Sequence, residues 1–583
     1  MSNPSAPSAI AELPRSHADH PAQRKIGLRR WLWLFLVVQC DALRSAPAAY
    51  FDAVWWRLIG KRVRSRNRIA ALTGHSPRAY RLWMARREPT VWPRLLDGDT
   101  SGFPPICVVI DCRFNPELAA ATLASIQPAS QRHFIFPLGG PTAQKLADTS
   151  APGALMLDWC SGPVELGRVL AARGGGWVCP LMAGDRLTAN ALSVYGQAAA
   201  QAGAAALIYA DDDLLDHNGK RHAPHFKPDW NAELFRFHDY LSYSAIIRLD
   251  PAAFPARDFA RSGDWVCTLV RAAVSHAAAP PIHVPAVLHH RTHRPTPPRA
   301  RALAPIATDT LPSVTIIIPT RNQRDLLRRC VEGVARTRYR HRDVIIIDND
   351  SDDPLTIAYL AQLVGKGVAV MPCPGPFNYA AMNNAAAERA TGEYLCFLNN
   401  DIEMLGDGWL AALIQQAIRS DVGAAGAKLL YPDHTLQHAG VVLGIGDAAA
   451  HAHRGLPDAE PGYFGRPHLP QFVSAVTGAC LVVAKPKFAA AGGFDETAFA
   501  VAFNDVDLCL KLNALGWQTL YEPRAVLIHH ESQSRGDDLS SEKRLRFAGE
   551  LAELKRRWHT DRLIDPFHHP ELSRFSEQFV VKV

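Results

Sequence analysis

Three runs of apolar residues in the second half of the chain each end abruptly in polar side chains. The runs are "SVTIIIPT" (313–320), "DVIIIDND" (343–350) and "GEYLCFLNND" (392–401). Continuous apolar runs of this kind are typical of strands buried on both faces, so they predict a parallel-centred α/β sheet. Because ligands of such sheets bind beyond the carboxyl ends of the strands, the polar residues become candidate site residues. They are Thr320, Arg321, Asn322, Asp348, Asn349, Asn399, Asn400 and Asp401.

The first half of the chain has a similar pattern. Strand-like runs occur in "ICVVID" (106–111), "AALIYADDD" (205–213) and "PPIHVPAVLHH" (280–290). The stretch 108–126 matches 316–334 in hydrophobic phasing, and "AVLHHRTH" parallels "AVLIHHES". The sequence therefore predicts an internal duplication of one α/β domain.

Composition shifts divide the chain into six parts. We expect a disordered tail (1–23), a helical N-terminal region (24–98), a first α/β domain (100–295), a Pro-rich basic linker (296–312), a second α/β domain (313–535) and a C-terminal helical extension (536–583). The extension is expected to be amphipathic around Leu545, Leu551, Leu554 and Trp558.

Charge and cysteine usage narrow the class of protein. The net charge is +7, with Lys and Arg spread among acids, which argues against nucleic acid as a partner. Eleven cysteines occur singly, without a C-x-x-C pair, as is typical of reduced thiols in a cytoplasm. The same pattern argues against a zinc site.

One short apolar segment raises the question of whether the chain contacts a membrane. In "RRWLWLFLVVQC" (29–40) the apolar run after Arg30 is much shorter than the roughly 20 residues that a span needs. Two alternatives remain: a basic helix lying on the cytoplasmic face of the membrane, or an ordinary buried helix.

Two strand-end carboxylates have both a chemical and a structural interpretation. The Asp348 carboxylate can accept hydrogen bonds from a base or ribose. Alternatively, Asp348 or Asn349 caps the N-terminus of a helix. Asp401 is a hard oxygen ligand suited to Mg²⁺ or Mn²⁺, or it is a turn residue.

Polar residues also gather at the start of a predicted helix, "FNDVDLCLKL" (503–512). They are Asn504, Asp505 and Asp507. The helix dipole stabilises acids at this position, which is the structural interpretation, whereas a carboxylate held near a sugar hydroxyl would be a general base. His529 and His530 end a later strand, and either imidazole could complete a metal site.

Together these motifs resemble glycosyltransferase family 2. The motifs, in order, are "SVTIIIPTRN", "VIIIDNDS", "FNYAAMNNAAAERATGEYLCFLNND", "GAKLLYPDHTLQHAGVVLG", "AVTGACLVVAKPKFAAAGGFDE", "FNDVDLCLKL" and "HHESQSRG". The resemblance is strong over residues 313–575 and weaker in the first half, and it points to bacterial tandem-domain O-antigen or rhamnan glycosyltransferases. It implies an α/β fold of GT-A type in two tandem copies, a nucleotide-diphosphate-sugar donor, a glycan or lipid-linked acceptor, inversion at the anomeric carbon and a divalent metal.

The resemblance also assigns roles by position. Asp505 inherits the role of catalytic base, with Asn504 replacing the commoner Glu, and Asp401 the metal role. Asn399 then makes at most a neutral contact, and His529 or His530 lies near the metal and diphosphate. The nucleotide contacts implied are Pro319, Arg321, Asn322, Asp348, Asn349 and Asn384.

The first half departs from the family pattern. Asp111 replaces the proline after its first strand, and only Asp185 remains of the metal motif, although Asp211, Asp212 and Asp213 offer carboxylates. We favour a degenerate domain that binds acceptor or packs on its partner; a second active transferase is the alternative.

Two other classes of function stay open. A non-catalytic protein that binds sugar nucleotides or scaffolds a polysaccharide assembly would bind donor without turnover. A nucleotidyltransferase would use the same α/β core, but the chain lacks a Gly-rich phosphate loop of that type. The donor sugar, the acceptor and the linkage do not follow from these residues.

Overall fold

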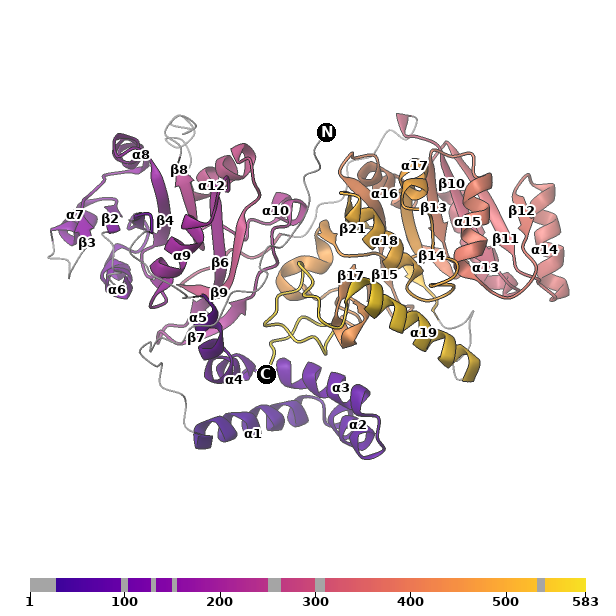
Figure 1. Cartoon of the computed structure of the whole chain (residues 1–583), viewed down its shortest axis with the longest axis horizontal. Coiled ribbons are helices and arrows are strands. Elements are labelled where there is room, and N and C mark those ends of the chain that lie inside the picture. The colour runs from indigo at the N-terminus through magenta and orange to yellow at the C-terminus, as the bar shows by residue number, and fades with distance from the viewer. Residues whose placement is uncertain are drawn as a thin grey trace.

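The computed structural model describes residues 28–95, 103–126, 133–148, 155–249, 264–298, 310–531 and 541–583, so the expected tail of residues 1–23 lies outside the described residues. Two α/β units lie side by side, with helices of the N-terminal region below them (Figure 1). We call residues 103–298 the first unit and residues 310–531 the second unit.

The N-terminal region is helical, as its sequence predicts. It contains α1 (Leu28–Ser45), α2 (Pro47–Leu58), α3 (Arg62–Gly74), α4 (Ala79–Arg86) and α5 (Glu88–Leu95). None of the helices in the described ranges is both long and apolar enough to cross a membrane.

The first unit is a sheet flanked by helices. Its strands are β1 (Ile106–Asp111), β2 (His133–Leu138), β3 (Leu155–Leu157), β4 (Gly176–Met182), β5 (Arg186–Leu187), β6 (Leu207–Leu215), β7 (Arg221–His225), β8 (Ala245–Leu249) and β9 (Ile282–Arg291). Its α-helices are α6 (Ala119–Ser125), α7 (Pro141–Ala147), α8 (Pro163–Ala172), α9 (Ala191–Ala200), α10 (Ala232–Phe237) and α12 (Trp265–His276).

The second unit has the same architecture with additional strands. Its strands are β10 (Val314–Thr320), β11 (Arg342–Asp348), β12 (Ala369–Pro372), β13 (Tyr394–Leu398), β14 (Ile402–Met404), β15 (Val422–Leu430), β16 (Leu436–His438), β17 (Val441–Leu443), β18 (Ala449–His451), β19 (Gln471–Val473), β20 (Cys480–Ala484) and β21 (Gln518–His529). Its α-helices are α13 (Arg324–Arg336), α14 (Pro354–Gly365), α15 (Tyr379–Arg389), α16 (Trp409–Ala417), α17 (Lys485–Ala490) and α18 (Asn504–Ala514).

The two sheets share one topology. Their strand orders are β3-β2-β1-β4-β8-β6-β9-β5 and β12-β11-β10-β13-β20-β15-β21-β14. Pairing directions agree position by position: β1 and β10 run parallel to both neighbours, whereas β8 and β20 run antiparallel to both of theirs. The structure therefore contains one mixed α/β topology twice.

The second sheet is buried on both faces, as its apolar runs predict. Along β10, Ile317 packs into one core with α15 and α18, while Ile316 and Ile318 pack into the other with α13 and α16. Successive side chains of a strand point to opposite faces, so an uninterrupted apolar run is what such a strand requires.

The C-terminal extension is helical only in part, which corrects the expectation for residues 536–583. Helix α19 (Ser541–Trp558) is followed by a largely irregular segment, 559–583, that lies between the two units (Figure 1). Its backbone and side chains bond to all three neighbours: Pro566 accepts from Asp229 N, Asp565 from Leu443 N and Glu571 from Trp83 Nε1. The segment thus ties the helical region and both units together, which the sequence did not predict.

Candidate functional site

The carboxyl ends of β10, β11 and β13 meet at one edge of the second sheet, as expected of parallel strands. Asn349 N donates to Thr320 O at 2.9 Å, and the buried Asn400 donates from Nδ2 to Thr320 Oγ1, also at 2.9 Å. Asn400 therefore joins two strand ends, while its neighbours Asn399 and Asp401 line a pocket.

The predicted nucleotide contacts at this edge differ in how far their polar groups are engaged. Pro319 is buried within β10, and Arg321 is exposed beyond its end. Asn322 accepts from Asp352 N and Asp353 N at 3.0 Å, so its amide organises the loop after β11. Their role toward a nucleotide stays a prediction.

The helix-cap alternative for Asp348 and Asn349 is wrong. Helix α14 is capped by Asp353, whose carboxylate accepts from Thr356 N at 2.9 Å. Asp348 Oδ1 accepts instead from Ser351 N (3.2 Å), and Asn349 donates to Cys373 O and Gly375 O. Both residues stay at the strand end, where a nucleotide contact is predicted.

Asn384 lies apart from the pocket lining. Its Nδ2 donates to Phe494 O and Glu496 Oε1, and its Oδ1 accepts from Phe494 N. The amide therefore holds the loop around residue 494 in place, and the geometry gives the predicted nucleotide contact no support.

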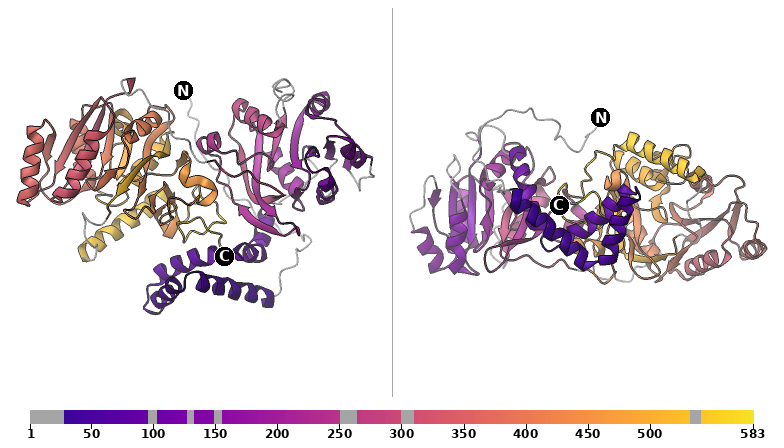
Figure 2. Two further views of the ribbon diagram at one scale, coloured as in Figure 1. Left: turned by 180° about the vertical axis from the view of Figure 1, so that it is seen from behind. Right: turned by 90° about the horizontal axis from the view of Figure 1, so that it is seen from below.

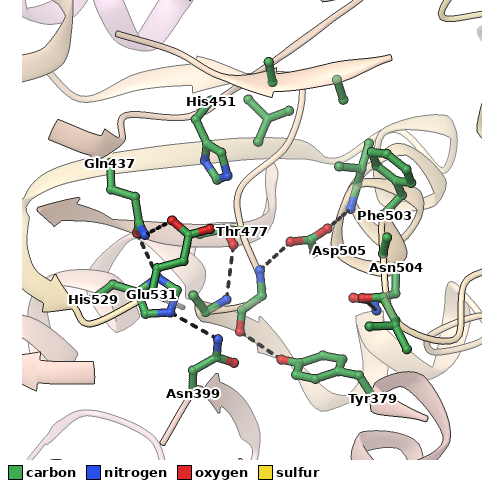
Figure 3. Close-up of a pocket in the computed structure, with 18 of the residues that line it drawn as sticks. Tyr379, Asn399, Gln437, His451, Thr477, Phe503, Asn504, Asp505, His529 and Glu531 are labelled. Carbon is green, nitrogen blue, oxygen red and sulfur yellow. Dashed lines mark hydrogen bonds between the residues drawn. The ribbon is translucent and has the colours of Figure 1, made fainter. Parts of the chain in front are cut away.

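A pocket of about 400 Å³ opens between the ends of β13 and β21 and the start of α18 (Figure 3). It brings together four of the predicted residues that are far apart in the sequence: Asn399, Asp401, Asp505 and His529. Apolar and aromatic side chains line much of its remaining wall: Val441, Ala449, Ala450, Val501, Ala502, Phe503, Val506 and Phe547.

One corner of the pocket is built from Asp401 and His529. His529 Nε2 lies 3.1 Å from Asp401 Oδ1, and Asn399 Nδ2 lies 3.4 Å from the same nitrogen. The other ring nitrogen of His529 bonds Gln437 Oε1 at 2.8 Å, and Gln437 Nε2 donates to Glu531 Oε2, also at 2.8 Å (Figure 3).

This chain of contacts fixes the tautomer of His529. The Glu531 carboxylate accepts, so it must face the NH₂ of Gln437, and Gln437 must present its oxygen to His529. Burial alone would raise the pKa of Glu531, but the Gln437 hydrogen bond and the nearby His529 lower it, which keeps the carboxylate ionised. Nδ1 of His529 therefore carries the proton, and in the neutral ring Nε2 is an acceptor aimed at Asp401.

The donor set of this corner fits a divalent cation. Two acceptor atoms 3.1 Å apart need a cation between them, either a proton or a metal ion. With metal–ligand bonds of about 2.1 Å, adjacent ligands of an octahedral ion lie about 3 Å apart. The carboxylate oxygen is the kind of ligand that Mg²⁺ and Mn²⁺ prefer, the imidazole nitrogen is a softer ligand beside it, and substrate phosphates would complete the ligand set.

Of the two histidines predicted for this role, the structure places only His529 beside Asp401. Adjacent residues of a strand point to opposite faces. His530 accordingly lies with its Nε2 2.9 Å from Glu403 Oε2 and 3.2 Å from Arg329 Nη1, away from the pocket lining.

Asp505 lies at the opposite side of the pocket (Figure 3). It is the second residue of α18, which follows Phe503, and the left-handed backbone of Phe503 (φ 61°) is rare for an aromatic residue. Gly478 N donates to Asp505 Oδ2 at 2.8 Å, and Tyr379 Oη donates to Gly478 O at 2.9 Å. The carboxylate is thus partly exposed to the pocket and oriented by backbone.

Asp507, two residues later, has a structural role. It is fully buried and accepts from Arg557 Nη1 (3.0 Å) and Trp558 Nε1 (2.9 Å), while Lys511 Nζ lies 3.2 Å from its other oxygen. It therefore anchors α19, and of the acids at this helix start only Asp505 faces the pocket.

Sequence reasoning missed several residues that shape the site. Gln437 and Glu531 orient His529, and Thr477 and Tyr379 line the pocket beside Gly478. His451 also lines it; burial lowers the pKa of His451 to about 4, so this ring is neutral at neutral pH. Gln437 and Glu531 stand inside the quoted motifs "LQHAG" and "HHES", which are the available sequence signals.

Among its described residues, the first unit has no equivalent corner. Arg186 pairs with His290 as Ile402 pairs with His529, so Asp185 and His290 occupy the places of Asp401 and His529. Thr292 N and Oγ1 donate to Asp185 Oδ1 at 2.8 and 2.9 Å. His290 Nδ1 bonds Asp213 Oδ1 at 2.7 Å and so is paired with a different carboxylate.

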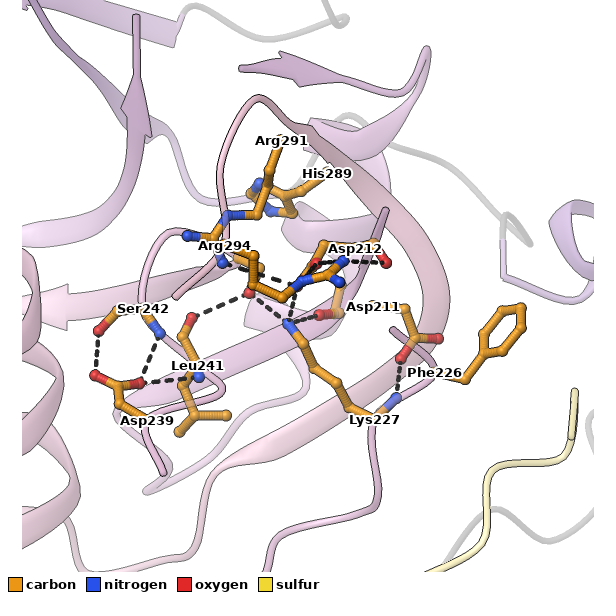
Figure 4. A network of polar contacts seen from close by, with 12 residues as sticks. Asp211, Asp212, Phe226, Lys227, Asp239, Leu241, Ser242, His289, Arg291 and Arg294 are labelled. Carbon is orange, nitrogen blue, oxygen red and sulfur yellow. Dashed lines mark hydrogen bonds and ion pairs between the residues drawn. The ribbon is translucent and has the colours of Figure 1, made fainter. Parts of the chain in front are cut away.

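The three carboxylates of "YADDD" are also engaged within the protein, and Figure 4 shows the contacts around Asp211 and Asp212. Asp212 lies 2.8 Å from the fully buried Lys227 Nζ and accepts from Arg294 Nε at 2.7 Å. Asp213 accepts from Tyr80 of the helical region. These contacts engage the carboxylates within the protein; that the domain is degenerate, and binds acceptor or packs on its partner, stays a prediction.

Asp211 forms the third such cluster, with His283 and His569. His283 lies between Asp211 (3.2 Å) and Asp229 (2.9 Å), and His569 Nε2 lies 2.8 Å from Asp211. Glu571 N donates to His569 Nδ1, so the proton of that ring sits on Nε2, facing Asp211. Protons therefore occupy this cluster, which attaches the C-terminal segment to the first unit.

The cluster predicts a pH-dependent stability. Burial opposes a charge on His283, but the hydrogen bonds that its ring donates to the Asp211 and Asp229 carboxylates outweigh the effect of burial and raise the pKa of His283 to about 9. Because the pKa of His283 is higher in the folded than in the unfolded protein, protonated His283 stabilises the fold. This stabilisation is complete below the unfolded pKa of about 6.5 and is lost as the pH rises through 9. We expect the free energy of unfolding in urea to fall between pH 6.5 and 9 by on the order of 2–3 kcal/mol, and His283→Gln to remove that pH dependence.

The control is His217→Gln, at an exposed histidine of the same unit, which should keep the pH dependence. An unchanged pH dependence in His283→Gln would contradict a raised pKa of His283.

The fold and the pocket together define an α/β protein with a polar site at the carboxyl edge of its second sheet. Residues 315–440 match the family model described as Glycosyl transferase family 2. Over these residues the second unit is therefore similar to glycosyltransferase family 2, as its motifs predict.

Relatives show the same likeness over longer stretches. The chain is 36% identical over 456 residues to "Uncharacterized protein y4gI" of Sinorhizobium fredii, covering 70% of this chain and 49% of that protein. It is 36% identical over 407 residues to "O-antigen biosynthesis protein RfbC" of Myxococcus xanthus, covering 63% and 32%. It is 27% identical over 263 residues to "N-acetylglucosaminyl-diphospho-decaprenol L-rhamnosyltransferase" of Mycobacterium tuberculosis, covering 40% and 80%. The matches thus span about half and a third of the first two relatives.

Proposed function

We propose that the chain is an inverting, metal-dependent glycosyltransferase that moves a sugar from a nucleotide-diphosphate donor to a growing polysaccharide or lipid-linked glycan. One observation carries the proposal: Asp505 and the Asp401–His529 corner share a single pocket. A carboxylate and a cation-binding corner on opposite sides of one cavity suit an acceptor hydroxyl and a departing diphosphate.

The residues of the chain then divide the chemistry. Asp505 takes the proton of the acceptor hydroxyl as its oxygen attacks the anomeric carbon from the face opposite the leaving group, so the configuration inverts. Gly478 and the α18 backbone hold that carboxylate in place. Exposed Arg321 at the end of β10 is proposed to face the diphosphate.

Asp401 and His529 would hold Mg²⁺ or Mn²⁺, which when bound neutralises charge on the diphosphate. Gln437 and Glu531 keep the Nε2 lone pair of His529 turned toward Asp401. Asn399 stands where a second carboxylate would complete an Asp-x-Asp pair.

Changing Asn399 to Asp tests this corner. A carboxylate in place of the amide that lies 3.4 Å from His529 Nε2 adds a hard ligand, so Asn399→Asp should retain transfer and bind Mn²⁺ severalfold more tightly in calorimetry. If the variant instead loses transfer while binding Mn²⁺ normally, Asn399 makes a specific neutral contact with the donor.

The substrate class rests on the relatives. Their printed names include O-antigen biosynthesis and a rhamnosyltransferase acting on a lipid diphosphate, so rhamnose is the candidate sugar and a lipid-linked glycan the candidate acceptor. The proposal places the protein in the cytoplasm, in peripheral contact with the inner membrane where such an acceptor would lie.

The stereochemistry of the product tests the displacement. Nuclear magnetic resonance of the glycoside formed from a donor of known anomeric configuration should show inversion. Retention would contradict a single displacement with Asp505 as base.

A further inference from the structure

The outer surface of the N-terminal helices combines exposed apolar side chains with basic ones. Eight large hydrophobic side chains between residues 32 and 63 are more than a third exposed: Leu32, Trp33, Leu36, Phe51, Trp55, Leu58, Ile59 and Val63. We call this set the outer apolar face. Soluble proteins rarely leave so many large apolar groups together in water, and such patches mark interaction sites.

The face follows from the way α1 packs. Leu34 and Val38 of α1 are buried against Leu82 of α4, so one apolar side of the helix is already covered. Trp33 and Leu36, on another side, are 59% and 53% exposed. On α2, Phe51, Trp55 and Leu58 recur at helical spacing and are 59–76% exposed. Both helices therefore carry a second apolar stripe that no described part of the chain covers.

The surrounding charge is strongly basic. Residues 28–74 contain nine Lys and Arg and only two acids, and all nine basic side chains are exposed: Arg29, Arg30, Arg44, Arg57, Lys61, Arg62, Arg64, Arg66 and Arg68. Of the acids, Asp41 is paired with Arg78. The excess of seven positive charges equals the net charge of the whole chain, so this region supplies its basic character.

The arrangement of the helices leaves this region accessible. Helices α1 to α3 lie below both α/β units, and the view from below meets them first (Figure 1, Figure 2). No described helix is long and apolar enough to span a bilayer. A surface of Trp, Phe and Leu flanked by Arg and Lys is the chemistry of helices that lie in the membrane interface.

We propose that α1 and α2 dock the protein on an anionic lipid bilayer through the outer apolar face. Trp33, Leu36, Phe51, Trp55 and Leu58 enter the boundary between head groups and acyl chains, and the basic side chains around them face lipid phosphates, except Arg66, which stacks on Phe575. This deepens the membrane contact of the proposed function by naming its residues and lipid charge. Vesicle binding is measured without donor, so its failure and a failure of sugar transfer can be told apart.

The test is co-sedimentation of the full chain with phosphatidylcholine vesicles, with and without about 30 mol % phosphatidylglycerol. We expect binding to the anionic vesicles that is much weaker with phosphatidylcholine alone and falls at about 0.5 M NaCl, where charge is screened. Each basic side chain near the surface adds roughly fivefold to binding. Trp33→Ser with Trp55→Ser should weaken binding at least about tenfold, since two aromatic groups no longer leave water.

The matched control is Leu355→Ser with Ile357→Ser on α14, which are 60% and 48% exposed on a helix without Lys or Arg. The control should bind vesicles like the unchanged protein, and thermal unfolding should show both variants folded, because all four residues are exposed. Failure to bind anionic vesicles, or equal binding by the tryptophan variant, overturns the proposal. A third result would also overturn it: the unchanged protein is a dimer in light scattering and does not bind vesicles, and the tryptophan variant is a monomer. The outer apolar face would then be a contact between two copies of the chain.

Discussion

Asp505→Asn is expected to lower the turnover number by about 10²–10⁴-fold, the usual contribution of a general base, while the donor dissociation constant changes little. An amide has the size of the carboxylate and can still accept the hydrogen bond of Gly478 N, so the loop and the start of α18 should keep their geometry. What is lost is the ability to take a proton from the acceptor hydroxyl. Steady-state transfer and calorimetric donor binding measure the two quantities separately.

The control for this substitution is Asp325→Asn, an exposed acid on α13 of the same unit. It should leave transfer unchanged. Full turnover by Asp505→Asn would rule out Asp505 as the base, and a loss of donor binding together with turnover would indicate a role in holding the donor instead.

Asp401→Ala is expected to abolish metal-dependent transfer and to weaken Mn²⁺ binding by at least about tenfold. Asp401 supplies the carboxylate oxygen that lies 3.1 Å from His529 Nε2, and its removal leaves His529 as the remaining strong ligand among the described residues of the corner. Calorimetry with Mn²⁺ reads the site directly, independently of activity.

Glu403→Ala is a matched control, because Glu403 is an acid two residues along the chain that pairs with His530 outside the pocket lining. It should keep metal binding and transfer. Equal Mn²⁺ affinity in Asp401→Ala and the unchanged protein would show that this corner does not hold the ion.

The part of the site that lies at strand ends could be predicted from sequence, because apolar runs reveal where a buried strand stops. Asn399 and Asp401 are predicted in this way, and His529 by its place at the end of a later strand. The orientation of His529 could not be found, because it depends on Gln437, 92 residues earlier, and on an amide whose direction is fixed by Glu531. Such a relay exists only once β16 and β21 have been brought together.

The fold could be predicted to the level of two α/β domains with a helical N-terminal region. The irregular C-terminal segment could not, because its interactions are with residues far away in the sequence: Asp229, Leu443 and Trp83. Asp348 shows a smaller failure of local reasoning. Helix α14 begins later than the strand end suggests, and Asp353 rather than Asp348 caps it.

The first unit illustrates the limits of motif counting. "YADDD" offers three adjacent acids, yet buried lysine, arginine and histidine side chains of the same fold neutralise them. A carboxylate run therefore indicates a ligand site only when its charge is left for a ligand, which the structure decides and the sequence does not.

The most direct test of the account is turnover of a panel of nucleotide-diphosphate sugars by the purified protein, with Mg²⁺ or Mn²⁺ and a glycan acceptor. The account predicts release of nucleoside diphosphate from at least one donor, dependent on the metal and lost in Asp505→Asn. Donor binding without release would instead identify a sugar-nucleotide-binding scaffold, and release of pyrophosphate a nucleotidyltransferase; either result would contradict the proposed transferase.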